Sequence, residues 1–258
     1  MSWKPLLALL ALAAPARAQT RPLHTEEAAT APAGRLVLES GFDFIRDEPN
    51  FLTSRPRDRW DAPILRLVYS PGDAVEVDVE WTARIFARED PVFGSVSDYG
   101  DVALRTKLRF ARESPGRPAV GARFAVTLPE TNSLEGLGPN TIRVRAEVLL
   151  SKTFGRASVH ANLGGAIEDK PLEPHAQSDF LAYGLALERR ATGSLDVLAE
   201  VAGLGAGRGY PGADRRSEAR AGFRYRAGRA RWDAALRRGL EATDGRWGFT
   251  AGLAWTLR

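Results

Sequence analysis

Hydrophobic and polar residues alternate one by one through most of the chain from Arg35 onward. In the clearest stretch, residues 75–85, the odd positions are apolar and the even positions are Glu, Asp, Glu, Thr and Arg. A period of two is typical of a β-strand with one apolar and one polar face. About twelve segments have this pattern, each close to the ~9–11 residues that a tilted strand needs to cross a bilayer. We predict strands at 35–46, 61–70, 74–86, 99–110, 118–128, 141–153, 157–167, 180–189, 195–204, 217–227, 230–238 and 246–257.

The connections between these segments alternate strictly in length. The short ones are 71–73, 114–116, 154–156, 192–194 and 228–229. The long ones are 47–60, 87–98, 129–140, 168–179, 205–216 and the shorter 239–245. Bacterial outer-membrane barrels have short periplasmic turns and longer outer loops, and an even strand number places both termini in the periplasm. The sequence therefore predicts an all-β fold, a twelve-stranded antiparallel up-and-down transmembrane β-barrel over residues 35–258.

The amino-terminal 18 residues have the features of a secretory signal peptide. Lys4 supplies a positive start, residues 6–14 are apolar, and two alanines stand at positions 16 and 18 before a cleavage site at Gln19. The apolar run is too short for a permanent membrane helix, which makes a membrane anchor the less favoured alternative. Residues 19–34 are rich in Ala, Thr and Pro without any period, and we expect a flexible lead-in. The mature protein is thus expected in the outer membrane of a Gram-negative cell.

Composition narrows the chemistry. The absence of cysteine excludes disulfides, zinc–thiolate sites and thiol nucleophiles, and with 1 Met and 3 His we expect no metal and no cofactor. Loss of the signal peptide leaves 34 basic residues against 32 acidic ones, so nucleic acid is not an expected partner. The expected partners are the lipid bilayer of the outer membrane, the barrel-assembly machinery and small solutes.

Charges lie on one face of nearly every segment, and we assign that face to the lumen and the apolar face to lipid. Between the third and fourth segments, one register brings every inward charge opposite a charge of the other sign. This salt-bridge ladder pairs Arg84 with Asp101, Glu80 with Arg105, Asp78 with Lys107 and Glu76 with Arg109. We expect such a ladder to reinforce the wall and to contribute little net field.

Two groups of arginines are in excess over the acids on their own faces. The first is Arg123, Arg143 and Arg145, which share a face with Glu147, and the second is Arg220, Arg224 and Arg226, which share one with Glu218. Both groups are candidate lumen contacts for anionic or carboxylated solutes. Pairing with acids on other strands, such as Glu39, Asp196 or Asp233, is an equally favoured alternative.

Several short motifs resemble a known family. They are Gly41-Phe42, the run YGDVALRTK at 99–107, Leu128-Pro129 before Gly136-Leu137-Gly138, and HANLG at 160–164. Together they resemble the outer-membrane transporter-like family labelled MetA-pathway of phenol degradation, over most of the chain from Arg35. The family usually has Gly-Leu-Gly-Asp where this chain has Asp98-Tyr99-Gly100-Asp101, and the terminal Arg258 stands where outer-membrane barrels commonly have an aromatic residue. The resemblance implies a barrel that passes hydrophobic or aromatic compounds, and it implies no catalytic residues.

Three further groups of residues are candidates for catalysis, for cation binding and for phosphate binding. Ser158, His160 and Asn162 share the lumen face of one segment, but residues two apart on a strand are roughly 6.5–7 Å apart, too far for direct contact between nucleophile and base. The acids and His175 at 168–175 lack the spacing of a calcium loop, and the alternating glycines at 203–209 lack the strand–helix context of a phosphate site. We interpret both as outer loops.

These observations favour an outer-membrane channel or transporter for small solutes, with aromatic and anionic compounds as candidates, and not an enzyme. Two alternatives stay open. One is a lipase- or esterase-like barrel enzyme, and the other is an exported soluble β protein that binds a ligand.

Overall fold

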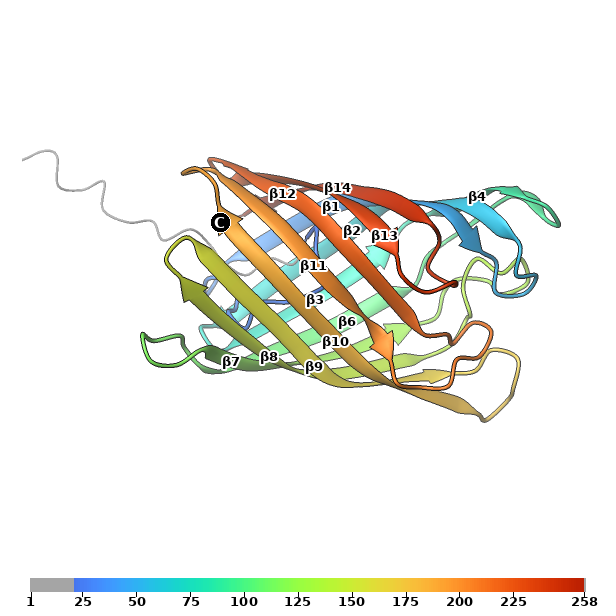
Figure 1. Ribbon diagram of the computed structural model, residues 1–258, viewed down its shortest axis with the longest axis horizontal. Coiled ribbons are helices and arrows are strands. Elements are labelled where there is room, and N and C mark those ends of the chain that lie inside the picture. Colours follow the sequence, from blue (N-terminus) through green and yellow to red (C-terminus); the bar gives the residue numbers. More distant parts are fainter. Residues whose placement is uncertain (1–20, 258) are drawn as a thin grey trace, which may run out of the picture.

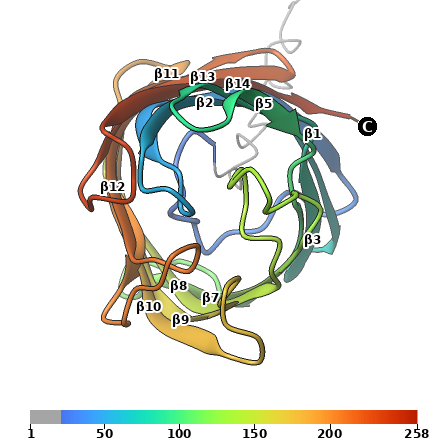
Figure 2. The ribbon, with the colours of Figure 1, turned by 90° about the vertical axis from the view of Figure 1, so that its right-hand side faces the viewer.

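One antiparallel sheet closes on itself into a barrel in the computed structural model, which describes residues 21–257 (Figures 1 and 2). Neighbouring strands follow the order of the chain, and β1 pairs with both β2 and β14 to complete the closure. Within these residues no helix is long and apolar enough to cross a membrane. The strands are β1 (Leu36–Pro49), β2 (Pro56–Gly72), β3 (Val75–Thr82), β4 (Ile85–Asp90), β5 (Gly94–Asp98), β6 (Val102–Ala111), β7 (Ala119–Leu128), β8 (Arg143–Phe154), β9 (Ala157–Asp169), β10 (Gln177–Arg190), β11 (Leu195–Gly205), β12 (Arg216–Ala227), β13 (Ala230–Gly239) and β14 (Trp247–Thr256).

Two pairs of these strands are continuous pieces of the wall. β3 and β4 follow one another along β2, and β6 and β5 follow one another along β3 and β4. When each pair is taken as one barrel strand, the described part of the chain has twelve, which confirms the predicted fold. Short turns lie at the end that carries the C-terminus, and longer loops lie at the other end (Figure 1).

The predicted outer loop 87–98 is instead the hairpin β4–β5. The alternation changes phase at the break between β3 and β4. Ile85 and Ala87 are buried against Leu137, whereas Phe86 is exposed. This change of phase, followed by the charged run Arg88-Glu89-Asp90, hid the hairpin in the sequence.

The hairpin also corrects the predicted ladder. Glu76 lies opposite Lys107 and Asp78 opposite Arg105, a register two residues away from the expected one. The same register runs through β4 and β5, where Ile85 pairs with Asp98. Pairing of opposite charges in the sequence was therefore not enough to select the alignment.

The two faces of the wall differ as predicted. Outward side chains such as Leu163, Leu185 and Leu236 are 58–67% exposed, while inward Glu76 and Glu147 are at most 3% exposed. An apolar exterior of this extent is solvated by lipid, and a charged interior by water and counter-charges.

The described part of the predicted lead-in lies inside the barrel, where the dark blue trace of Figure 2 crosses the lumen. We call residues 21–35 the luminal segment. Leu23 packs against Ala186 and Leu198, Ala28 against Ala119 and Leu149, and Ala31 against Val37, Val68 and Ala254. Small side chains let the segment lie close to the wall, a placement that composition alone did not indicate. The predicted signal peptide lies outside the described residues.

Candidate functional site

The luminal segment separates two cavities. The outer one, of about 740 Å³, lies between residues 21–26 and the long loops. The inner one, of about 250 Å³, lies between Glu27, Ala29 and the short turns at the other end. The segment therefore forms a boundary of both chambers.

The wall holds the segment largely through its main chain. The backbone N–H groups of His24 and Thr25 donate to Glu200 at 2.7 and 2.8 Å, and that of Ala31 donates to Glu76 at 2.6 Å. In the opposite direction, Arg224 donates to the carbonyl of Arg21 and Arg220 to that of Pro22, both at 2.7 Å. Hydrogen bonds to charged groups are worth about 1.5–3 kcal/mol each, so these contacts fix the path of the segment.

The side chain of Glu26 lies among three cations of the wall. Its carboxylate lies 2.7 Å from Lys107 Nζ, 3.0 Å from Arg123 Nη1 and 3.4 Å from Arg66 Nη2. Burial by itself raises the pKa of Glu26, but the three cations outweigh it and hold that pKa well below its usual value. A charged Glu26 thus ties the segment to β2, β6 and β7 at once.

All six arginines that the charge pattern singled out face the lumen, and each contacts a carboxylate. In the first group, Arg143 lies 2.5 Å from Asp101, while Arg123 and Arg145 share Glu147 at 2.6 and 2.7 Å. The three do not form the uncompensated patch that their excess suggested, because Asp101 and Glu26 supply acids from elsewhere.

The second group is paired as well. Arg220 lies 2.5 Å from Glu218, Arg224 lies 2.6 Å from Glu188, and Arg226 pairs with Asp196. The other two candidate acids pair elsewhere, Glu39 with Arg231 at 3.0 Å and Asp233 with Arg21 at 3.6 Å. Of the acids named for cross-strand pairing, only Asp196 pairs with one of these six arginines within the described residues, while Arg145 and Arg220 pair with acids of their own strands.

Part of the predicted ladder exists in the shifted register. Lys107 lies 3.0 Å from Glu76, and Arg105 bridges Asp78 at 3.0 Å and Glu80 at 2.5 Å. Arg84 and Arg109 are not in it. Arg84 donates to Ser97 Oγ at 2.9 Å and lies over the Tyr99 ring, and Arg109 lies opposite Gly121 beside the inner cavity.

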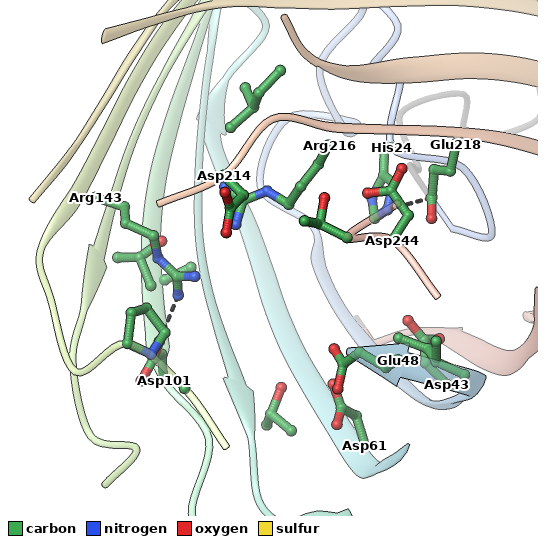
Figure 3. A pocket seen from close by; sticks show the side chains of 18 of the residues that line it. His24, Asp43, Glu48, Asp61, Asp101, Arg143, Asp214, Arg216, Glu218 and Asp244 are labelled. Carbon is green, nitrogen blue, oxygen red and sulfur yellow. Dashed lines mark hydrogen bonds and ion pairs between the residues drawn. The ribbon is translucent and has the colours of Figure 1, made fainter. Parts of the chain in front are cut away.

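The outer chamber is charged but close to neutral, with eleven arginines and ten carboxylates in its lining. Figure 3 shows Arg143 and Asp101 on one wall and Asp43, Glu48 and Asp61 on another. In the surrounding loops, burial raises the pKa of Asp214 and of Asp244. A nearly balanced lining of this kind holds water without a strong preference for one sign of ion.

The loop 129–142 narrows the mouth of this chamber. Arg57 donates to the carbonyls of Glu135 and Gly136 at 3.0 and 2.5 Å, and Asn50 Nδ2 donates to the former at 3.1 Å. Leu137, 1% exposed, packs against Ile85 and Ala87. The loop is thus fastened to the wall on the side of β2 and β4.

His160 contacts a serine of the neighbouring strand and not Ser158 of its own strand. Its Nδ1 lies 2.8 Å from Ser151 Oγ on β8, while Ser158 bonds to Thr153. Glu188 lies 3.9 Å from His160 Nε2, which completes the residue types of a hydrolase triad. However, Glu188 is bound to Arg224, and Ser151 Oγ lies under the segment and accepts the N–H of Ala28 at 2.8 Å. The pair therefore fastens the segment, and Asn162 contacts neither partner.

The remaining candidates lie partly in strands, because Glu168 and Asp169 end β9 and Gly203 lies in β11. Glu168 pairs with Arg216, and Glu173 pairs with Lys170 at 2.9 Å. Among residues 21–257, no group of three or more His, Asp or Glu side chains is arranged to hold a metal ion. Of the alternating glycines, Gly205 ends β11 and the next two lie in the loop after it.

Sequence reasoning missed the segment, with Glu26 as its main anchor, and the contact between Ser151 and His160. One signal was present. The unbalanced arginines of the wall required acids from outside their strands, and residues 26 and 27 are the only acids in the lead-in.

No family model matches the chain, and no curated protein matches it. Among solved structures, it is similar to a COG4313 outer membrane channel from Pseudomonas putida F1, with a TM-score of 0.66 and 17% identity over 89% of this chain and 97% of that one. It is also similar to the β domain of the Bordetella autotransporter BrkA, with a TM-score of 0.52 and 12% identity over 87% and 99% of the two chains. These likenesses show a shared fold.

Proposed function

We propose that this protein is an outer-membrane channel for small solutes and that its lumen is the path. The observation that carries the proposal is a closed barrel with an apolar exterior and two charged internal chambers, with the luminal segment between them. A protein that used the barrel purely as an anchor has no need for chambers on both sides of a thin partition.

The resemblance in short motifs and the similarity in fold to a COG4313 outer membrane channel support this function. On the same grounds we propose that the chain belongs to the transporter-like family named above. We further propose that it is exported with cleavage before Gln19 and inserted by the barrel-assembly machinery. Anionic and aromatic solutes remain the proposed cargo classes.

The experiment that tests the channel is conductance in planar bilayers. We expect the mature protein to conduct weakly, because the segment fills the middle of the lumen, and a variant that lacks residues 21–31 to conduct several-fold more. Heat-modifiable migration on a denaturing gel checks that both barrels are folded. If neither protein conducts although both are folded, the channel function is wrong.

A further inference from the structure

The inner chamber carries an excess of positive charge that the outer chamber lacks. Its lining contains seven arginines and only four carboxylates. Three of these arginines, Arg109, Arg156 and Arg190, form no ion pair with another residue of the described chain. Asp73 lies near Arg109 and Asp196 lies opposite Arg190, but the arginines of the lining still outnumber its carboxylates. The chamber therefore attracts anions from the side of the short turns.

One buried hydrogen-bond donor on the deeper wall of this chamber has no partner among the described residues. Arg231 is buried, bonds to Glu39 through Nη2, and has a buried Nε without a hydrogen-bond partner. The hydroxyls of Ser151, Thr153 and Ser158 line the same space. A volume of about 250 Å³ is roughly that of eight waters at about 30 Å³ each, enough for a small oxyanion with part of its hydration.

We propose that the inner chamber is a binding site for a small oxyanion of the phosphate or carboxylate class. Guanidinium groups bind such anions by forked hydrogen bonds. The ligand is a free solute and not a lipid headgroup, because these side chains face the lumen. That this site lies on a solute path rests on the channel function proposed above. Binding of the anion itself can be measured without any conductance experiment.

The strand alternation provides a matched control. Arg190 lies opposite Asp196 and shares the inward face of β10 with Glu188. Arg189, its neighbour, shares the outward face with the exposed Leu187. Neither Arg109 nor Arg190 forms an ion pair within the described chain, so the fold is expected to tolerate their replacement.

The test is isothermal titration calorimetry with inorganic phosphate on the folded mature protein in detergent, at low ionic strength and with chloride as the matched salt. We expect saturable binding by the parent and by Arg189→Gln, and binding at least about tenfold weaker in the double variant Arg109→Gln/Arg190→Gln. Heat-modifiable migration verifies that each protein is folded. The proposal is overturned if the parent shows no saturable binding, if the double variant binds like the parent, or if binding is lost in Arg143→Gln of the outer chamber instead. A protein that binds phosphate without conducting keeps this site and loses only the channel.

Discussion

Glu26 and Arg123, 97 positions apart in the sequence, form a hydrogen bond of 3.0 Å inside the barrel. Arg123 also binds Glu147, the one acid that its own face offered in the sequence pattern. The charge balance of the wall is therefore completed by the luminal segment, so the segment is part of the lumen structure.

Glu26→Gln is expected to loosen the segment. The amide keeps the shape of the side chain but loses the charge that three cations share, which we estimate to weaken docking by about 2 kcal/mol. That corresponds to about a 30-fold change in the equilibrium between docked and released segment. The measurement is the open probability of single channels, which we expect to rise. Glu173→Gln in an outer loop is the control, and an open probability as low as the parent's would show that Glu26 does not hold the segment.

Acid is expected to release the segment in the parent. The pKa of docked Glu26 lies well below its ordinary value of 4.5, so its contribution to docking is complete above the ordinary pKa and is lost as pH falls through the lower, docked pKa. Conductance should be constant between neutral pH and about pH 5 and should rise below about pH 4. In Glu26→Gln this rise should be absent, and an identical acid response in both proteins would assign the effect to other groups.

The barrel could be predicted because a period of two and the length of connections are local properties of the sequence. The alternation alone predicts that Leu163 faces lipid and that His160 faces the lumen. The site could not be predicted, because its contacts depend on register and on a segment without any period. Ser151 lies opposite His160 in the observed pairing of β8 with β9, and Arg105 lies opposite Asp78 in the observed register of β3 with β6.

The assignment of faces can be tested at two adjacent residues of β6. Leu104 faces outward between Val79 and Val126, whereas Ala103 lines the outer chamber opposite Glu80. An arginine on the lipid face costs about 2–4 kcal/mol at the bilayer midplane, while one in the lumen beside a carboxylate is solvated. Leu104→Arg should therefore assemble much less well than Ala103→Arg, as measured by heat-modifiable migration in the membrane fraction. Equal assembly of the two would reverse the assigned phase of β6.

Arg57→Ala is expected to loosen the loop 129–142. This change removes the donors to the carbonyls of Glu135 and Gly136 and leaves Asp90 without its buried cation. Amides of residues 133–138 should then exchange hydrogen at least about tenfold faster, equivalent to about 1.4 kcal/mol of lost local stability. Arg55→Ala, at the exposed tip of a neighbouring loop, is the control and should leave that exchange unchanged. Unchanged exchange in Arg57→Ala would mean that Leu137 packing alone holds the loop.

The pairing of Arg143 with Asp101 leads to an expectation about ion selectivity that differs from that for a free arginine. In the structure the two side chains lie 2.5 Å apart at the wall of the outer chamber, so their fields largely cancel. Arg143→Gln leaves an uncompensated carboxylate and should shift the reversal potential in a salt gradient toward cations. Asp101→Asn leaves an uncompensated guanidinium and should shift it toward anions, while the asparagine oxygen can still accept the N–H of Thr131.

The double variant Arg143→Gln/Asp101→Asn removes both charges together, and we expect its reversal potential to return to that of the parent. A guanidinium that acted alone on the solute would behave differently, because the double variant would then keep the whole shift of Arg143→Gln. The cycle of four proteins thus separates a pair whose opposite charges offset each other from an arginine that acts alone, because in the second case Asp101→Asn would leave the reversal potential unchanged.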